Sequence, residues 1–405
     1  MRILFLSHRL PYPPDHGAKI RAYYFIRHLS EKHSVTVASL AESEEELRQA
    51  SGLRDACDDL IVEILPPRNR WLQALKAFPT SVPASVAYFW SDNLQRRIDE
   101  RLHTVKFDAI FVFCAFAAQY VRRPHPAWKV LDYCDIDSAK WMEYSKYKAF
   151  PLSLGYALEA AKLRRYERGV AQQFDQSAVI SPAELEEFKA LDVHVPCSVI
   201  HNGVDASYFR QNQKKPGSKV IVFLGRMDYF PNVDGINFFA KEIFPLIRNK
   251  RPGAALRIVG SNPVKSVQEL AKGPNVSVTG YVADVRQAMS DAAVSIAPLR
   301  IARGTQNKIL ESMAMGIPVV ATSKAAKGLG VNAQARLLIA DDRQTFADQV
   351  ISVLDDDDLG MRLSAGGREY VEAELSWSNA LLRLDDLLAK AGITHEKCSS
   401  PPHPW

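Results

Sequence analysis

The feature that most constrains this chain is a regular alternation of short apolar runs with amphipathic segments of helix length. Continuous apolar runs separated by helices indicate strands buried on both faces, as in parallel sheets covered by helices. In the first half, the predicted strands are residues 2–7, 35–40, 60–65, 109–113, 130–133 and 178–180, with helices at 18–32 and 44–56. In the second half, they are residues 220–224, 255–259, 276–278, 294–297, 318–321 and 337–340. The sequence therefore predicts an α/β protein built on doubly wound parallel sheets.

The length of 405 residues exceeds what one hydrophobic core usually supports, so two domains are expected. The strand pattern stops at Phe209, and the polar stretch that follows is the best candidate for a linker. The expected parts are an N-terminal domain at 1–208, a linker at 209–219, a C-terminal domain at 220–370, a helical segment at 371–395 and a disordered tail at 396–405. Ligands bind at the carboxyl ends of such strands, so the two domains are expected to face a central cleft that holds the active site.

Composition and charge exclude several classes of protein. The net charge is +5, and residues 101–168 hold 12 Lys and Arg against 7 Asp and Glu, but no extended basic stripe or recognition module indicates a nucleic-acid partner. The five cysteines are scattered without C-x-x-C spacing, which favours reduced thiols over zinc ligands. The apolar runs at the N-terminus and at 109–118 are too short for a secretory signal or a membrane span, so a cytoplasmic protein is expected.

The strongest chemical signal lies in residues 298–322. A strand ends at Pro298, a turn around Gly304 follows, and a helix is expected to begin near Thr305 and to end at Gly316. The buried face of this helix is expected to consist of Ile309, Leu310, Met313 and Ala314. Glu311 is flanked by apolar side chains, and a carboxylate there can accept from both vicinal hydroxyls of a ribose, while the helix N-terminus favours phosphate. An ordinary helix glutamate is the alternative interpretation.

The run from Glu311 to Thr322, ESMAMGIPVVAT, resembles the donor-site helix of retaining glycosyltransferases of family 4, in which E-A-M-A-x-G-x-P-V-V-A-T is typical. The resemblance implies the GT-B fold, with an acceptor-side and a nucleotide-sugar-binding Rossmann-like domain. It assigns the nucleotide ribose to Glu311. The family's other glutamate, eight residues earlier, is replaced here by Arg303. The residues of this segment expected to bind the donor are Arg303, Gly304, Thr305, Lys308 and Glu311.

A second match lies at residues 222–235, VFLGRMDYFPNVDG, which resemble the first strand and loop of the family's C-terminal domain. Gly225 lets the backbone approach a ligand, and Arg226 can bind a diphosphate with two parallel hydrogen bonds. A surface ion pair is the alternative for Arg226. The family often has a lysine six residues later, where this chain has Asn232, so Lys308 is the candidate replacement cation. Arg226 and Lys308 are therefore candidate catalytic residues.

Three weaker matches support the same family. Residues 201–209 resemble a loop that enters the domain junction, although Asn-Gly alone predicts only a turn. Residues 278–282 resemble the segment that contacts the nucleobase, which makes Tyr281 and Val282 donor-binding candidates, although a strand end explains the pattern equally well. Residues 11–17, PYPPDHG, resemble a glycine-containing loop over the cleft. The acceptor-side candidates are His16, Gly17 and Arg21, and His16 is also a candidate catalytic group, with an incidental loop histidine as the alternative.

Residues 131–141, LDYCDIDSAKW, and the proline-rich first loop resemble a subgroup of the family tied to bacterial exopolysaccharide and exosortase loci. The expected reaction is transfer of a sugar, hexosyltransferase-like and retaining, from a UDP- or GDP-linked donor to a glycan or lipid-linked acceptor, with no cofactor. The basic stretch 101–168 predicts salt-reversible contact with the anionic inner face of the cytoplasmic membrane, with solvated helix faces as the alternative. The side chains expected to make that contact are Arg122, Arg123, Trp128, Trp141, Arg164 and Arg165.

Several rival functions fit the sequence less well. Asp132, Asp135 and Asp137 imitate the D-x-D metal site of a single-domain glycosyltransferase fold, but the donor-helix match lies elsewhere, so metal-independent transfer is expected. A dehydrogenase would carry G-x-G-x-x-G after the first strand, and the first loop has no such motif. A sugar-nucleotide epimerase of the same fold and a non-catalytic relative remain the alternatives.

Overall fold

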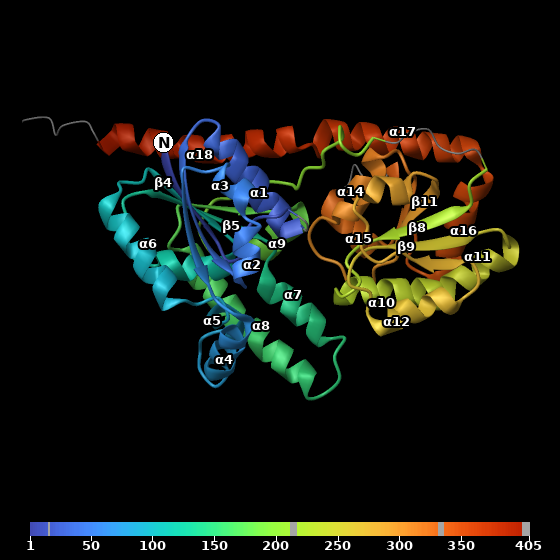
Figure 1. Ribbon diagram of the computed structural model, residues 1–405, viewed down its shortest axis with the longest axis horizontal. Coiled ribbons are helices and arrows are strands. Elements are labelled where there is room, and N and C mark those ends of the chain that lie inside the picture. Colours follow the sequence, from blue (N-terminus) through green and yellow to red (C-terminus); the bar gives the residue numbers. More distant parts are fainter. Residues whose placement is uncertain (15–16, 211–216, 331–335, 399–405) are drawn as a thin grey trace, which may run out of the picture. The chain divides into compact units, whose positions relative to one another are not determined.

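The computed structural model describes residues 1–14, 17–210, 217–330 and 336–398. The chain forms two compact units, one of Met1–Ile200 with Leu381–Trp405 and one of His201–Ala380 (Figure 1). The division thus falls earlier than the expected limit at residue 208, and the chain from Leu381 onward returns to unit 1. Most of the expected linker, residues 211–216, and most of the expected tail, residues 399–405, lie outside the described residues.

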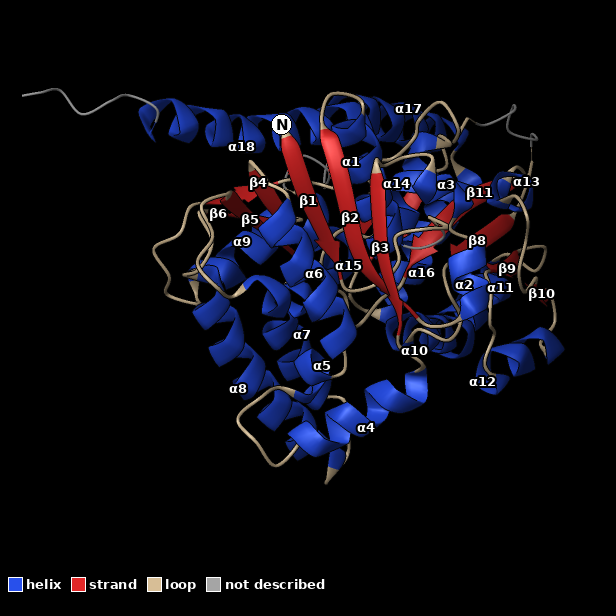
Figure 2. Ribbon diagram, turned by 60° about the vertical axis from the view of Figure 1, so that its left-hand side comes forward, coloured by secondary structure: helices blue, strands red, loops and turns tan. Residues whose placement is uncertain are grey.

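Unit 1 is built on a seven-stranded parallel sheet with the order β3-β2-β1-β4-β5-β6-β7. Figure 2 shows β1, β2 and β3 side by side, with helices packed around the sheet. The strands are β1 (Arg2–Ser7), β2 (Ser34–Ala41), β3 (Asp59–Ile64), β4 (Ala109–Phe113), β5 (Trp128–Cys134), β6 (Gln176–Val179) and β7 (Cys197–Val199). The order reverses between β1 and β4, as in a doubly wound sheet.

The helices of unit 1 follow the strands in the alternation that the sequence predicts. They are α1 (Gly17–Ser30), α2 (Glu44–Arg48), α3 (Ser51–Arg54), α4 (Pro67–Ala77), α5 (Ala84–Ala87), α6 (Asp92–Thr104), the 3-10 helix η1 (Ala115–Val121), α7 (Asp137–Ser145), α8 (Leu152–Ala171) and α9 (Pro182–Lys189). The helix expected at 44–56 is divided into α2 and α3, since Gln49 and Ala50 belong to neither. The helix α18 (Trp377–Cys398) joins this unit through Asp385, which lies 2.8 Å from His28 and 3.0 Å from Lys32 of the loop after α1.

Unit 2 is built on a six-stranded parallel sheet with the order β10-β9-β8-β11-β12-β13. Its strands are β8 (Val220–Leu224), β9 (Ala255–Val259), β10 (Val276–Val278), β11 (Ala292–Ala297), β12 (Val319–Ala321) and β13 (Leu338–Ile339). The helices are α10 (Phe230–Phe238), the π-helix η2 (Phe239–Ile243), α11 (Phe244–Lys250), α12 (Lys265–Gln268), η3 (Glu269–Lys272), α13 (Val285–Met289), α14 (Asn307–Ala314), α15 (Ser323–Ala326), η4 (Lys327–Leu329), α16 (Arg343–Asp355) and α17 (Asp357–Glu374).

The central strands of each sheet are buried because helices cover both of their faces. Every residue of β4 and β11 is buried, which explains why these strands read as continuous apolar runs. In unit 1, Phe5 of β1 stacks on Phe111 of β4 with ring centroids 5.1 Å apart, and Phe25 of α1 meets the same ring edge-on at 5.9 Å. The predicted α/β class and the two doubly wound parallel sheets are therefore confirmed.

Candidate functional site

Most of the predicted donor residues of unit 2 lie in the two loops at the point where its strand order reverses. β8 and β11 are neighbours in the sheet, but the chain leaves β8 toward β9 on one side and leaves β11 toward β12 on the other. The loop after β8 carries Gly225 and Arg226, and the loop after β11 leads into α14. Loops that diverge at the carboxyl ends of adjacent parallel strands leave a crevice in which ligands bind.

The backbone around Gly225 is crowded. A Cβ atom at this position would lie 2.6 Å from the side-chain nitrogen of Asn232 and 3.2 Å from Nζ of Lys308. A Cβ atom at Gly260, which follows β9, would lie 1.7 Å from the carbonyl oxygen of Gly225. Only glycine fits at these two positions, so the loop after β8 is held against the start of α10, the helix α14 and the end of β9.

Asn232 connects the two sides of the crevice. Its side-chain nitrogen donates to the carbonyl oxygen of Arg226 at 2.9 Å, and its side-chain oxygen accepts a hydrogen bond from Nζ of Lys308. Lys308 is buried, and its ammonium lies 4.6 Å from the ring centroid of Phe223 on β8. Asn232 thus positions a cation that comes from the other loop.

Burial shifts the pKa values of Lys308 and Glu311, the two titratable side chains of α14, in opposite directions. It lowers the pKa of Lys308 to about 7, against the opposing attraction of Glu311. It raises the pKa of Glu311 to about 7, again against the attraction between the two groups. Near neutral pH each of the two side chains is therefore partly protonated, and a bound anion would favour the charged form of Lys308.

Arg226 points its guanidinium at a carboxylate of its own loop. Nη2 lies 2.7 Å from Oδ2 of Asp228, and Nε donates to Oδ1 of the same side chain at 3.2 Å. Partial burial, the largest single effect, opposes ionisation of Asp228, but the hydrogen bond from Arg226, the positive charge of Arg226 and further hydrogen bonds together outweigh it, so the pKa of the carboxyl is lowered. About half of the Arg226 side chain is exposed, so the guanidinium is oriented and accessible at once.

The start of α14 differs from the expectation. The helix begins at Asn307 with Gln306 as its N-cap, and no side chain caps it, whereas Thr305 was expected in that role. The Thr305 hydroxyl instead donates to the carbonyl oxygen of Gly328 at 3.4 Å. A Cβ atom at Gly328 would lie 2.0 Å from the carbonyl oxygen of Gly304, so these two backbone segments touch. This contact, rather than a cap, holds the loop before the helix.

The rest of α14 follows the sequence pattern. The four side chains expected on its inner face, Ile309, Leu310, Met313 and Ala314, are all buried. Gly316 has a φ of 67°, and its N–H donates to the carbonyl oxygen of Met313 while that of Ile317 donates to Ser312. This is the left-handed glycine termination that the sequence predicts. Glu311 is half-buried on this short helix, three residues after Lys308.

The remaining donor candidates lie at the margins of the site. Tyr281 follows β10 and is 79% exposed, while Val282 is half-buried and packs against a small apolar cluster that includes Val222 and Leu224. Because β10 is separated from β8 by β9, these two residues lie farther along the same sheet edge. Arg303 is half-buried in the loop before α14, where its carbonyl oxygen accepts from Gln306 at 2.9 Å.

The three acceptor-side candidates do not form an accessible site among the described residues. His16 lies outside the described residues, and Gly17 is the first residue of α1. Arg21 is fully buried, forms a 2.8 Å ion pair with the equally buried Asp132, and donates to the carbonyl oxygen of Ile200. A buried, paired guanidinium of this kind holds α1 against β5, so the placement of Arg21 in an acceptor loop is corrected to a structural role.

Asp132 is therefore occupied by Arg21, which removes it from any D-x-D site. Within the described parts of the chain, no group of three or more His, Cys, Asp and Glu side chains is arranged to hold a metal ion.

One polar cluster in unit 1 was missed as a site by the sequence analysis. At the carboxyl end of β5, Asp137 and Ser138 are buried together with Glu167 of α8, whose Oε1 accepts from the backbone N–H of Ser138 at 3.1 Å. Burial, and then the nearby Asp137, raise the pKa of Glu167 to about 8. The available signal was the run of polar residues directly after a buried strand, which was considered only as a metal motif.

Comparison with known proteins identifies the class of fold and domain. Residues 218–356, which lie within unit 2, match the family model of the glycosyl transferases group 1. Sucrose-phosphate synthase from Thermosynechococcus elongatus superposes with a TM-score of 0.73 at 18% identity, over 97% of this chain and 100% of that one. HepE of Anabaena in complex with UDP-glucose superposes with a TM-score of 0.65 at 15% identity, over 96% and 100%. These likenesses confirm the predicted GT-B fold.

Two relatives by sequence extend the comparison. A 44.6 kDa uncharacterized protein of the cps region of Klebsiella pneumoniae is 22% identical over 380 residues, which are 87% of this chain and 90% of that protein. The GDP-mannose-dependent alpha-(1-6)-phosphatidylinositol monomannoside mannosyltransferase of Mycobacterium tuberculosis is 31% identical over 159 residues, which are 36% and 41% of the two chains. The second match thus spans less than half of that relative.

Proposed function

We propose that this protein is a retaining glycosyltransferase that moves a sugar from a UDP- or GDP-linked donor to a glycan or lipid-linked acceptor in polysaccharide biosynthesis. The observation that carries the proposal is the link from the backbone carbonyl of Arg226 through the side chain of Asn232 to the ammonium of Lys308, which ties together the two cation-bearing loops at the strand-order reversal of unit 2. Relatives of known activity support the donor class, because one group uses GDP-mannose and HepE binds UDP-glucose. The cps-region relative supports the polysaccharide context.

In the proposed reaction, the bond between the anomeric carbon and the diphosphate oxygen breaks as a bond to the acceptor hydroxyl oxygen forms on the same face. The acceptor proton passes to an oxygen of the departing diphosphate, so no protein nucleophile is needed. Arg226 and protonated Lys308 stabilise the negative charge that develops on the diphosphate. Glu311 accepts hydrogen bonds from the ribose hydroxyls and fixes the nucleotide, which positions the anomeric carbon.

The nucleotide specificity can be tested by thermal unfolding with UDP, GDP, ADP and CDP. The cognate nucleoside diphosphate at a hundredfold excess over its Kd should raise the Tm by about 5–10 °C, because it binds only the folded protein. A single responding nucleotide would identify the donor series. No response to any of the four would contradict the proposal and favour the non-catalytic alternative.

Transfer should also proceed without a divalent metal. Protein cations are placed to receive the diphosphate, so activity in excess EDTA should stay within about twofold of activity with Mg²⁺ or Mn²⁺. Release of nucleoside diphosphate is the measurement, with and without acceptor. Activity that is lost in EDTA and restored by either ion would show that a metal, and not Arg226 with Lys308, neutralises the leaving group.

A further inference from the structure

Exposed apolar side chains of unit 1 concentrate in two short segments. Of the 18 large apolar side chains that are exposed in the described residues, 11 come from residues 71–82 and 142–158. Trp71, Leu72 and Leu75 on α4 are 67%, 57% and 72% exposed, and Phe150 and Leu152 at the start of α8 are 81% and 63% exposed. Monomeric proteins rarely leave so many large apolar groups in water without a partner.

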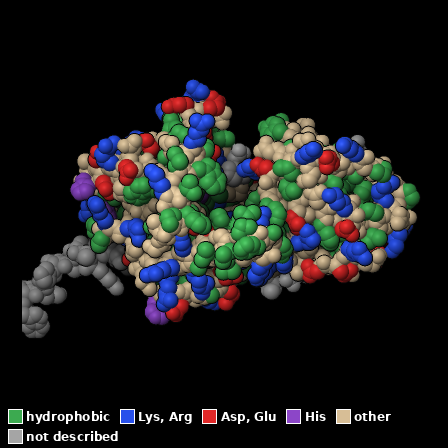
Figure 3. Space-filling model, turned by 90° about the horizontal axis from the view of Figure 1, so that it is seen from below, with side chains coloured by type: hydrophobic (Ala, Val, Ile, Leu, Met, Phe, Trp, Pro, Cys, Tyr) green, Lys and Arg blue, Asp and Glu red, His purple; other side chains and the backbone are tan. Residues whose placement is uncertain are grey.

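The two segments belong to one end of unit 1. Nζ of Lys162 on α8 donates to the carbonyl oxygen of Phe78 at 2.7 Å and lies 5.6 Å from the centre of its ring. The carboxylate of Glu159, also on α8, accepts from the backbone N–H groups of Ala84 and Ser85. In Figures 1 and 2, α4, α5 and α8 lie together, and Figure 3 shows hydrophobic side chains gathered on this end. We call it the apolar end of unit 1.

The charge of the apolar end is mainly positive. Residues 65–91 contain no Asp or Glu, and residues 142–158 contain a single acidic residue, Glu143. Both stretches contain cations, among which Arg68, Lys76 and Lys146 are exposed. An apolar surface fringed mainly by cations complements a bilayer with anionic lipids, whereas a protein partner buried there would need acidic groups to match.

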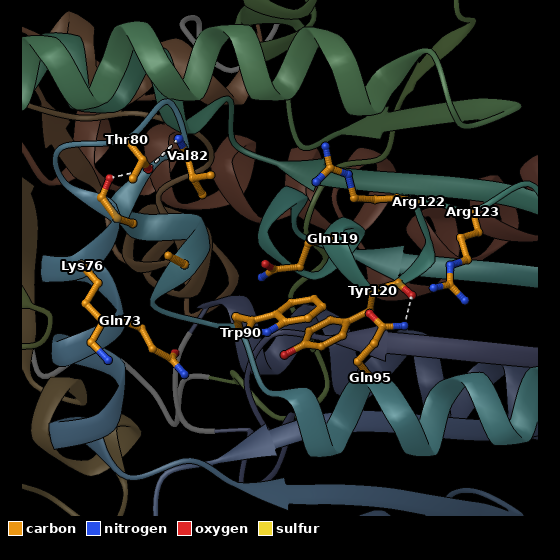
Figure 4. Close-up of a pocket in the computed structure, with 12 residues that line it drawn as sticks. Gln73, Lys76, Thr80, Val82, Trp90, Gln95, Gln119, Tyr120, Arg122 and Arg123 are labelled. Carbon is orange, nitrogen blue, oxygen red and sulfur yellow. Dashed lines mark hydrogen bonds between the residues drawn. The ribbon is translucent and has the colours of Figure 1, made fainter.

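A cavity of about 740 Å³ adjoins the same surface, since α4 and the loop after it contribute Lys76 and Val82 to its wall (Figure 4). Its lining includes Arg122 and Arg123 and no acidic residue. Trp90 and Tyr120 stack in it with centroids 5.2 Å apart, between Lys76 on one side and the two arginines on the other. An aromatic and apolar wall with three cations suits the phosphate and glycerol of a phospholipid headgroup.

We propose that the apolar end of unit 1 docks on a bilayer that contains anionic phospholipid. The exposed side chains of α4 and of residues 150–158 enter the interface, the neighbouring lysines and arginines contact lipid phosphates, and the cavity receives one headgroup. The proposal deepens the proposed function in that a lipid-linked acceptor requires the enzyme at a membrane surface. No helix in the described parts of the chain is long and apolar enough to cross a bilayer, so this docking is peripheral.

This surface differs from the one that charge alone predicts. Arg122 and Arg123 remain part of it, but the expected aromatic anchors do not, because Trp128 is half-buried and Trp141 packs on Tyr156 with centroids 5.0 Å apart. Arg164 donates to the carbonyl oxygen of Ala190, which engages it within unit 1.

Flotation of the full-length protein with phosphatidylcholine vesicles, with and without phosphatidylglycerol, tests the proposal. Binding should require phosphatidylglycerol and fall as salt rises from about 50 to 500 mM, because the charge contribution is screened within about 10 Å or less. Leu72→Ser with Leu75→Ser should lower the bound fraction at least about tenfold, because two apolar groups no longer enter the interface. Met361→Ser with Leu382→Ser removes equally exposed groups elsewhere and should bind like the wild type.

A second pair of variants tests the cavity. Arg122→Gln with Arg123→Gln should weaken the preference for phosphatidylglycerol, while Lys241→Gln with Lys272→Gln, which removes two exposed cations of unit 2, should not. Equal effects of the test and control pairs, equal binding to neutral vesicles, or binding to neither would overturn the proposal. So would a dimer in light scattering that the Leu72 and Leu75 variant converts to a monomer, which would assign the surface to a second copy of the chain. The nucleotide-induced Tm shift is measured on the same variants, so loss of membrane binding and failure of the proposed activity are separable.

Discussion

Replacing Glu311 by alanine should lower kcat/KM for the cognate nucleotide sugar about 30- to 1000-fold, which corresponds to the loss of one strong charged contact of about 2–4 kcal/mol. Glu311 is half-buried on α14, and burial raises its pKa to about 7, so the folded chain gains nothing from this carboxylate that alanine would forfeit. The variant should therefore have a Tm at least as high as that of the wild type. Steady-state kinetics and thermal unfolding of the same preparation are the two measurements.

The ribose contact itself can be isolated with a modified donor. Removing the 2′ and 3′ hydroxyls of the donor ribose should weaken turnover by the wild type strongly and by Glu311→Ala hardly at all, because the partner of those hydroxyls is already gone. Glu242→Ala, at an exposed glutamate of the same unit, serves as the control and should behave like the wild type. A Glu311→Ala protein that is well folded and fully active would refute the assignment of Glu311.

Donor binding should be accompanied by uptake of a proton at pH 8, and the amine of Lys308 should be the group that accepts it. Burial lowers the pKa of free Lys308 to about 7, so at pH 8 most of the molecules carry a neutral amine. A bound diphosphate favours the ammonium and raises this pKa, so binding above pH 7 draws a proton from solution and weakens as the pH rises further. Below pH 7, Lys308 is already charged and contributes no uptake. The pKa of free Glu311 is also about 7, so below pH 7 much of this side chain is protonated. Hydrogen bonds from the ribose stabilise its charged form, so donor binding below pH 7 should release a proton from Glu311.

Calorimetric titration in buffers of different ionisation enthalpy measures this exchange, with the intact nucleotide sugar as ligand because its diphosphate has no group that titrates near neutral pH. Lys308→Met should abolish the uptake at pH 8 and lower kcat/KM about 100-fold or more. Lys308→Arg stays charged at all these values, so it should abolish the uptake while retaining part of the affinity. Uptake that persists in both variants would place the titrating group elsewhere.

The sequence was sufficient for the central strands because burial on both faces makes them continuously apolar, as in β4 and β11. It failed at β7, a three-residue edge strand, Cys197–Val199, whose residues are only half-buried and leave no apolar run. It also joined α2 and α3 into one helix, because the helical periodicity continues across the break between them.

In the site, the local signal for the end of α14 succeeded, the one for its start did not, and long-range contacts could not be foreseen. The termination of α14 at Gly316 depends on neighbours within one turn and was predicted correctly. The partner of Arg21 is 111 positions away in the sequence, and the partner of Lys308 is 76 positions away. Residue type alone could not show that Arg21 forms a buried ion pair or that Lys308 is a desolvated amine. Both properties arise from what surrounds the side chain after folding.

The return of the chain to unit 1 has a consequence for the order in which the protein can assemble during synthesis. Unit 2 runs without interruption from His201 to Ala380, so every contact inside it is available once that stretch has left the ribosome. Unit 1 cannot be completed until the chain from Leu381 onward has been synthesised, some 180 positions after Ile200. His28 and Lys32 form ion pairs with Asp385, and the carbonyl oxygen of Val199 accepts a hydrogen bond from Arg383. The nascent N-terminal sheet therefore passes through translation with part of its α1 side uncovered. A chain cut after residue 380 would therefore contain all of unit 2 and would lack the segment that completes unit 1.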